Sequence, residues 1–215
     1  MKNQAGGSGT FGPGYSRALI AAASLYAIRA AYWQKYYVHR RLRPEAYAGL
    51  THNNKVNKTG YPIGADALNS EALDRLYIAN QTYLLPQAYL EGAPLHASYP
   101  GGASVSAGVS VTLLKALFDE SFVIPNPVVP DPKDSTKLIA YEGEPLTVGG
   151  ELNKLAANIG IGRNVAGIHW RSDAAASLAL GEAIAISILR DEKLTFRENF
   201  DGFTFTKFDG TKITV

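Results

Sequence analysis

The sequence of 215 residues contains no cysteine, so disulfide bonds and thiolate metal sites are excluded. It also lacks a dominant charge: 21 lysines and arginines stand against 19 acidic residues, and the net charge of +2 gives no reason to expect nucleic acid or a membrane surface as partner. No uninterrupted apolar run reaches the roughly 18 residues of a membrane-spanning helix. Glycines occupy the early positions where a signal peptide needs an apolar stretch. We therefore expect no membrane span and no secretion signal, and the compartment stays open.

The sequence does contain enough apolar residues for one domain with a core, since 46% of them are hydrophobic. Apolar residues recur at helical spacing, and capping residues and prolines mark the expected helix ends. The expected N-caps are Ser16, Ser70, Thr147 and Asp173. These patterns predict about five helices, at residues 15–42, 70–90, 105–118, 147–161 and 173–190.

The segments between these helices are expected to be loops. Residues 45–69 follow the helix-stopping Pro44 and are rich in glycine and asparagine, while residues 121–146 are rich in proline and leave room for a short hairpin. The tail around Asp209-Gly210 has the alternation typical of a strand pair. The chain is therefore predicted to be one all-α domain over residues 1–215, a helical bundle with long loops and a small C-terminal β piece.

The first candidate site lies in KYYVHRRLRP, where Lys35, His39 and Arg43 follow one another at four-residue intervals and so fall near one face of the predicted helix. A helix end with converging cations can hold a multiply charged anion, because Arg43 offers a planar fork and Lys35 a point charge. A solvated basic helix end gives the same pattern. This segment alone favours that simpler interpretation.

The second candidate is the glycine pair Gly101-Gly102, which precedes the predicted helix at 105–118 and lies five residues after His96. Backbone N–H groups of such a loop, together with a helix N-terminus, can bind an oxyanion. An ordinary turn has the same composition. A lone histidine in a loop is also more often a surface or hydrogen-bonding residue than a catalyst, so this pattern is weak by itself.

The third candidate is GRNVAGIHWRSD, which places Arg163, His169 and Asp173 in an otherwise apolar stretch. If the helix continues, Asp173 can accept a hydrogen bond from one ring nitrogen of His169. This fixes the tautomer and raises the basicity of the other nitrogen, which can then attack an electrophile or ligate a metal. The alternative, with Asp173 as a cap and His169 as a satisfied core residue, is about equally well supported.

Together the three segments resemble the vanadium-dependent haloperoxidases and the related phosphatidic-acid-phosphatase-type acid phosphatases. The shared pattern is a lysine, then Arg-Pro, then a glycine loop after a histidine, then Arg-x5-His-x3-Asp. The seven-residue gap between Lys35 and Arg43, with stretches such as WQKYYVHRRLRPEAYAG and GELNKLAANIGIGRNVAGIHW, is similar to the bromoperoxidases of marine algae and cyanobacteria. The similarity covers almost the whole chain. Because that family's proteins are longer, the chain resembles their C-terminal, active-site part.

The resemblance implies a four-helix bundle around a vanadate cofactor, with hydrogen peroxide, a halide and a small organic acceptor as partners. His169 would bind vanadium directly through a ring nitrogen, with Asp173 as its partner. His96 would sit beside the halide and peroxide. The vanadate oxygens would be neutralised or hydrogen-bonded by a larger set: Lys35, Arg43, Gly101, Gly102 and Arg163.

Two residues depart from the family pattern, because Gly101-Gly102-Ala103 stands where Ser-Gly-His is usual. The hydroxyl expected at position 101 and the acid–base imidazole expected at position 103 are both missing. General acid–base catalysis is worth about 10²–10⁴-fold, so the resemblance predicts a slow enzyme. Ser104 can donate a hydrogen bond but cannot exchange a proton near neutral pH.

The favoured hypothesis is a haloperoxidase that oxidises bromide or iodide with hydrogen peroxide and halogenates organic acceptors, built as a homo-oligomer. One alternative is an acid phosphatase with His169 as nucleophile, against which the Lys35–Arg43 gap and Ala103 both count. Another is a non-catalytic bundle that only binds an oxyanion, which the losses at positions 101 and 103 favour. Nucleic-acid binding through Arg40, Arg41 and Arg43 is a remote fourth, because it needs a wider basic face.

Overall fold

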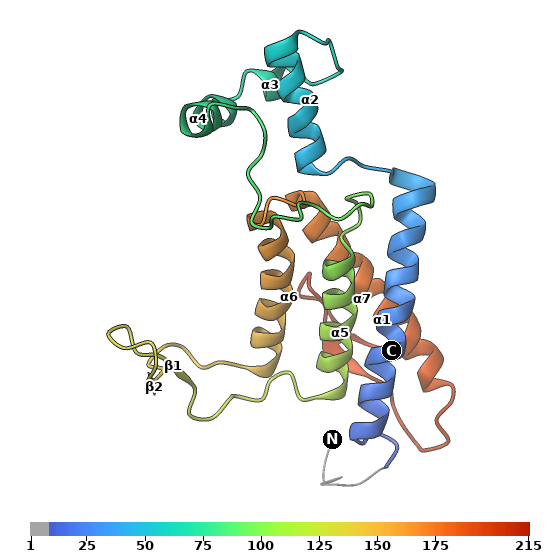
Figure 1. Ribbon diagram of the computed structural model, residues 1–215. Coiled ribbons are helices and arrows are strands. Elements are labelled where there is room, and N and C mark those ends of the chain that lie inside the picture. The colour runs from blue at the N-terminus through green and yellow to red at the C-terminus, as the bar shows by residue number, and fades with distance from the viewer. Residues whose placement is uncertain (1–8) are drawn as a thin grey trace.

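Four long helices lie side by side in the computed structural model, which describes residues 9–215 (Figure 1). They are α1 (Pro13–Trp33), α5 (Gly102–Leu117), α6 (Val148–Val165) and α7 (Arg171–Lys193). Helix α5 is central, since it contacts each of the other three. The predicted all-α bundle is therefore confirmed.

Small residues allow α5 and α7 to approach closely. A Cβ atom added to Gly108 on α5 would lie only 2.5 Å from the carbonyl oxygen of Leu178 on α7. A Cβ added to Gly181 on α7 would collide in the same way with the carbonyl of Val105 on α5. The two backbones are thus in direct contact, and a larger residue at either glycine would force them apart.

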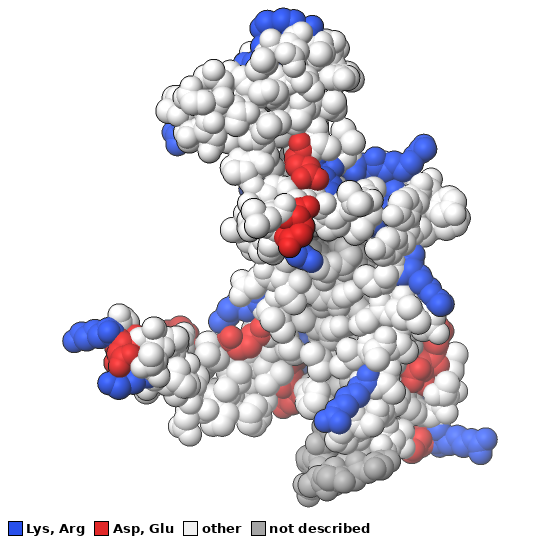
Figure 2. Space-filling model, in the orientation of Figure 1, with Lys and Arg blue, Asp and Glu red and all other residues white. Residues whose placement is uncertain are grey.

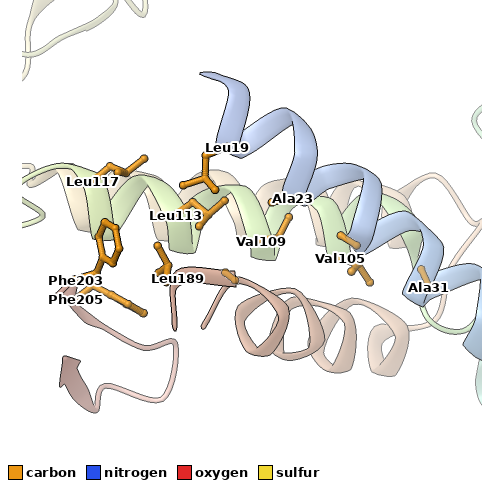
Figure 3. Packing of buried hydrophobic residues seen from close by; sticks show 12 residues of the cluster. Leu19, Ala23, Ala31, Val105, Val109, Leu113, Leu117, Leu189, Phe203 and Phe205 are labelled. Carbon is orange, nitrogen blue, oxygen red and sulfur yellow. The ribbon is translucent and has the colours of Figure 1, made fainter. Parts of the chain in front are cut away.

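The main core lies between α1, α5 and α7 and runs along their length (Figures 1 and 3). Helix α1 contributes a stripe at four-residue spacing that begins at Leu19 and continues through buried alanines to Ala31. Phe203 and Phe205 of the C-terminal tail close the cluster beside Leu117 and Leu189. Alanines on α1 let the bundle pack tightly, because they bring the helices close without filling the space between them.

The N-terminal helix begins earlier and ends earlier than the sequence predicted. It begins at Pro13, with Gly12 as the N-cap, and the predicted cap Ser16 instead donates to the carbonyl of Pro13. At Trp33 it continues into a π-helical turn, η1 (Gln34–His39), which ends at Arg40 with φ 44°. The prediction of one uniform helix to residue 42 was therefore wrong.

The expected loop at 45–69 is mostly helical. Pro44 starts α2 (Pro44–Asn57) rather than stopping α1, which suits proline because the first helical position needs no N–H donor. The short α3 (Ala65–Leu68) follows, and then α4 (Glu71–Asn80), which is shorter than the predicted 70–90 because Gln81 ends it with φ 55°. These helices extend away from the end of the bundle where the candidate site lies (Figure 1).

Two small antiparallel sheets complete the fold. Strands β1 (Val128–Pro130) and β2 (Leu138–Ala140) form the hairpin expected within 121–146, and β3 (Thr204–Thr206) pairs with β4 (Lys212–Thr214) across the predicted turn. The caps are confirmed in part. Thr147 accepts a hydrogen bond from the Gly150 N–H at the start of α6, whereas Asp173 lies in the first turn of α7, whose N-cap is Trp170.

A buried charged group ties the C-terminal hairpin to the bundle. The Lys115 ammonium on α5 donates to the carbonyl of Thr206 at 2.6 Å, and the Glu120 carboxylate accepts from the backbone and hydroxyl of the same residue. The Glu182 carboxylate on α7 accepts from the Phe208 N–H at 2.6 Å. Because each buried charge has a partner, this polar group fixes the tail without leaving an unsatisfied ion.

Helix α7 is the one helix among residues 9–215 that is long and apolar enough to cross a membrane, by length and composition only. A core helix that packs inside a helical bundle passes the same test. Here α7 packs against α5, and the carboxylates of Asp173 and Glu182 are buried within the structure.

Candidate active site

The π-helical turn positions Lys35. The N–H of Arg40 donates to the Lys35 carbonyl at 3.0 Å, a bond across five residues in place of the usual four. The Lys35 side chain is fully buried, and its ammonium donates to the carbonyls of Ala97, at 2.5 Å, and Ser98, at 3.1 Å. Burial, with a contribution from the charge of Arg43, lowers the pKa of Lys35 to about 8.

Arg43 joins the three predicted segments. It is the N-cap of α2 and only 5% exposed, and its guanidinium donates to the carbonyls of His96 at 2.8 Å and Ile168 at 2.7 Å. The same group lies 3.1 Å from Nδ1 of His96 and 3.3 Å from Nε2 of His169. One planar cation thus bridges the two histidines that the sequence singled out.

The guanidinium determines the tautomer of both histidines, because arginine only donates hydrogen bonds. Nε2 of His169 must accept from Arg43, so its proton is on Nδ1, 2.9 Å from the Asp173 carboxylate. Nδ1 of His96 accepts from Arg43 at the shorter distance, 3.1 Å, which puts its proton on Nε2 and leaves the Ala97 carbonyl, 3.3 Å from Nδ1, without that proton. Burial lowers the pKa of His169 against the opposing effect of Asp173, and burial also lowers the pKa of His96. Both rings are therefore neutral at pH 7.

The Asp173 carboxylate is fully buried and has several donors. Besides His169, it accepts from the Ser98 hydroxyl, from the Trp170 N–H at 3.1 Å and from the Arg41 guanidinium at 3.1 Å. Burial pushes the pKa of Asp173 upward, but the hydrogen bonds outweigh it and the net pKa is lowered. Asp173 is therefore an ionised anchor for the His169 ring.

The start of α5 lies directly against this pair. The Gly101 N–H donates to the Ser177 hydroxyl at 2.7 Å, and a Cβ added to Gly101 would lie 3.4 Å from Cε1 of His169. Gly102 and Ala103 begin the helix, where backbone N–H groups have no helical partner and carry partial positive charge. The imidazole thus faces a helix N-terminus that can donate to an oxyanion.

The structure brings together most of the predicted site residues. Arg163 is half-buried near the end of α6, and after burial its charge contributes to lowering the pKa of Arg43. His39 does not join the group: the π-turn turns it outward, where its ring lies 4.5 Å from that of Tyr99. The predicted common face of Lys35, His39 and Arg43 is therefore wrong for His39.

Three residues that position the site were not among the candidates. Arg41 and Ser98 hold the Asp173 carboxylate, and Ser177 holds the Gly101 backbone. Serines occur throughout the sequence, and these two have no distinctive spacing. Arg41 stands in a run of basic residues in which only the structure shows which side chain turns inward.

The chemistry of these groups fits a small tetrahedral oxyanion. Lys35, Arg43 and Arg163 supply positive charge, the α5 N-terminus supplies backbone donors, and Nε2 of His169 is an unprotonated nitrogen beside the Arg43 guanidinium. In the part of the chain that the structure describes, no group of three or more histidine or acidic side chains could chelate a simple metal ion. A single nitrogen ligand surrounded by cations suits vanadate or phosphate better than a bare cation.

Comparison with known proteins identifies the family of the bundle. Residues 17–197 match the model of the VCPO second helical-bundle domain. The chain belongs to this family. The chain is 42% identical to the vanadium-dependent bromoperoxidase of Corallina officinalis, over 95% of this chain and 37% of that protein's length. It is 41% identical to the Ascophyllum nodosum bromoperoxidase, again over 95% of this chain and 38% of that protein.

A solved structure is similar over the same region. It is the homohexameric second vanadate-dependent bromoperoxidase of Ascophyllum nodosum, with a TM-score of 0.82 and 33% sequence identity over 94% of this chain and 40% of that one. The resemblance deduced from the motifs is thus confirmed. The chain spans less than half the length of the relatives that it matches.

Proposed function

We propose that the chain carries the vanadate-binding site of a bromoperoxidase-type haloperoxidase, which oxidises bromide or iodide with hydrogen peroxide and halogenates small organic acceptors. The observation that carries the proposal is the Arg43 guanidinium, which lies 3.1 Å from one imidazole and 3.3 Å from the other. The relatives' names support it, since they describe vanadium-dependent bromoperoxidases.

In this proposal each residue has a role that its contacts suggest. His169 offers Nε2 to vanadium, while Asp173 holds the proton on the opposite nitrogen. Lys35, Arg43 and Arg163 neutralise the oxygens, and the N–H of Gly102 donates to one of them. When bound, vanadate supplies a Lewis acid that activates peroxide without changing oxidation state.

The cation group gains from an anion because its members repel one another. Burial and the neighbouring Arg43 charge destabilise the protonated form of Lys35, as its lowered pKa shows. An anion of two to three negative charges at the same point attracts each cation and offsets their mutual repulsion. This attraction is strong because the local dielectric constant is low. The carbonyls that hold Lys35 and Arg43 keep both cations in place before the anion arrives.

The test is bromination of an activated diketone by the purified protein, with vanadate, bromide and hydrogen peroxide each omitted in turn. We expect activity that needs all three and is lost in His169→Ala. The matched control is Arg75→Gln, which removes an exposed cation paired with Glu71 on α4. Bromination that persists without vanadate, or in His169→Ala, would contradict the proposal.

The same site suits a phosphatase in which His169 becomes phosphorylated, since its Nε2 is unprotonated and lies beside the Arg43 guanidinium. Leaving-group protonation is the weak point of this alternative, because Ala103 supplies no acid. Phosphomonoester hydrolysis that vanadate abolishes would favour it. Binding of vanadate without any turnover would instead favour a non-catalytic oxyanion-binding bundle.

We further propose that residues 1–215 act as one catalytic domain corresponding to the C-terminal part of a longer architecture, and that it self-associates. The shared length with the relatives supports the first point, and the homohexameric neighbour supports the second. Large apolar side chains that stay exposed agree with both, for example Tyr37 at 74% and Leu90 at 105%.

A further inference from the structure

A cavity of about 350 Å³ opens at the candidate site, on the side of His96, and shares Lys35 and Arg43 with it. Four segments line it: the π-turn at Lys35 and Tyr36, the connection Arg40–Arg43, the first turn of α2 at Glu45 and Ala46, and the loop Pro94–Ala97. Figure 2 shows Lys and Arg side chains in blue at the level where α2 meets the bundle, with acidic side chains in red beside them. A volume of this size suits a small organic molecule of one ring.

The charge of this cavity is strongly positive. Lys35, Arg40, Arg41 and Arg43 contribute four cations to its wall, against one carboxylate, that of Glu45. Three of the cations are already assigned, since Lys35 and Arg43 belong to the proposed vanadate site and Arg41 is paired with Asp173. The cavity therefore attracts an anion, and the fourth cation decides where it binds.

That fourth cation is Arg40. Its side chain is exposed at the cavity, and no residue between 9 and 215 accepts a hydrogen bond or forms an ion pair with it. Glu45 forms no ion pair with Arg40 within residues 9–215: its carboxylate accepts from the Ala93 N–H at 3.3 Å, and its charge acts on Arg43. An uncommitted guanidinium is suited to bidentate binding of a carboxylate.

The backbone of Arg40 by itself does not indicate a ligand. Its φ of 44° is unusual for a residue with a side chain, but Lys58 and Gln81 end α2 and α4 in the same conformation, with φ 56° and 55°. What distinguishes Arg40 is that its left-handed turn lies at the cavity wall. Lys58 offers a matched control, since it is a cation in the same backbone conformation at the end of α2, outside this cavity lining.

Aromatic rings connect Arg40 to the reacting centre. Tyr36 in the cavity wall stacks on Tyr32 with 5.7 Å between ring centroids, and Tyr32 lies 5.4 Å from the His96 ring. The exposed side chain of Leu95 adds an apolar surface. These surfaces suit a flat ring bound in the cavity that Arg40 and His96 both line.

We infer that this cavity binds the organic acceptor, and that Arg40 selects acceptors carrying a carboxylate, such as carboxylated phenols. The inference rests on the proposed function and adds its substrate class. Halogenation of such a ring forms a carbon–bromine bond, breaks the oxygen–bromine bond of hypobromous acid, and releases the ring proton with the hydroxide as water. Arg40 takes no part in those bonds and acts as a specificity-determining residue.

The test compares 4-hydroxyphenylacetate with its neutral analogue 4-hydroxyphenylacetamide in the full chain. We expect kcat/KM to favour the anion about five- to tenfold, the range of an exposed charge-assisted contact. Arg40→Asn, which suits the left-handed backbone without the charge, should bring the ratio close to one. Arg40→Lys should retain part of the preference, and the control Lys58→Asn should retain all of it.

A second measurement does not need turnover. Binding of the two compounds to the vanadate-free protein, followed by ligand-observed NMR, should show the carboxylate bound by wild type and released by Arg40→Asn. Equal ratios in wild type and Arg40→Asn, or no binding of the carboxylate, would overturn the inference. If Arg40→Asn raises the KM for bromide and leaves the acceptor ratio unchanged, the cavity guides halide instead and the inference is also overturned. Loss of bromination with intact carboxylate binding would count against the proposed function alone.

Discussion

At the scale of single residues, the site depends on groups that cannot exchange roles. Arg43 only donates, so the lone pairs of His96 and His169 both turn toward it. Asp173 only accepts while ionised, so the His169 proton stays on the far side of the ring. This fixed pattern of donors and acceptors keeps one ring nitrogen of His169 unprotonated, and a bound oxyanion would replace the hydrogen bond that this nitrogen accepts from Arg43.

Position 103 limits the rate in this scheme. Ala103 lies in the first turn of α5, next to the Gly102 N–H, and cannot transfer a proton. We expect Ala103→His to raise bromide oxidation about 100-fold, the lower end of what general acid–base catalysis provides. Ala103→Gln is the matched control, because it has similar bulk without a titratable group. Equal rates in the two variants would show that the substitution acts through shape alone.

Lys35 gives a pH dependence of stability whose sign follows from its pKa. The folded pKa of about 8 lies below the ordinary 10.5, so between these values the unfolded chain binds more protons than the folded one. Wild type should therefore gain stability relative to Lys35→Met as the pH rises from about 8 to 10. Urea unfolding of both proteins at several pH values measures this difference. A difference that stays constant with pH would mean that the lysine is not strained by burial.

At the scale of elements, the contact between α5 and α7 holds the site together, because α5 carries Gly102 and α7 carries Asp173. We expect Gly181→Ala to destabilise the protein by about 2 kcal/mol or more, since the added methyl collides with backbone. Gly162→Ala on α6 is the control: a Cβ there meets nothing within 4 Å, so it should be neutral or stabilise the helix. Urea unfolding measures both. Equal effects at the two positions would contradict the close approach of α5 and α7.

Element types were predicted better than element ends. The bundle helices, Thr147 as a cap and the two hairpins follow from local sequence, because apolar spacing and turn residues act over a few positions. Pro44 was assigned as a stop although it begins α2, since proline is accepted at either place. The π-turn after Trp33 has no sequence signal that we could read, yet it moves His39 away from Lys35 and Arg43.

The sequence indicated the charged groups of the candidate site, but it did not indicate the residues that hold these groups in position. Lys35, Arg43 and His169 stand out because charges and imidazoles are rare in apolar stretches. Ser98, Arg41 and Ser177 act through contacts across 75 or more residues, and such partners depend on the packed bundle. The family resemblance rests on the order of the motifs along the chain, whereas the distances between their side chains come from the structure.

At the scale of the whole molecule, three distant segments converge on one point only when the bundle is assembled. Lys35 belongs to the π-turn η1 that follows α1, Arg43 to the start of α2, and His169 to the turn between α6 and α7. The central claim is that this convergence makes an oxyanion site with one nitrogen ligand. It can be tested separately from the chemistry that follows.

The most direct measurement is equilibrium dialysis of vanadate and of phosphate against the purified chain. We predict one saturable vanadate site per chain, and we expect its affinity to fall at least about tenfold in Arg43→Gln and in His169→Ala. Arg43→Gln removes charged hydrogen bonds, so it should weaken the binding of both anions. His169→Ala should weaken vanadate binding more than phosphate binding. Arg75→Gln should bind like wild type, and thermal melts confirm that each variant is folded. Absence of saturable vanadate binding, or binding that neither site substitution weakens, would contradict the claim.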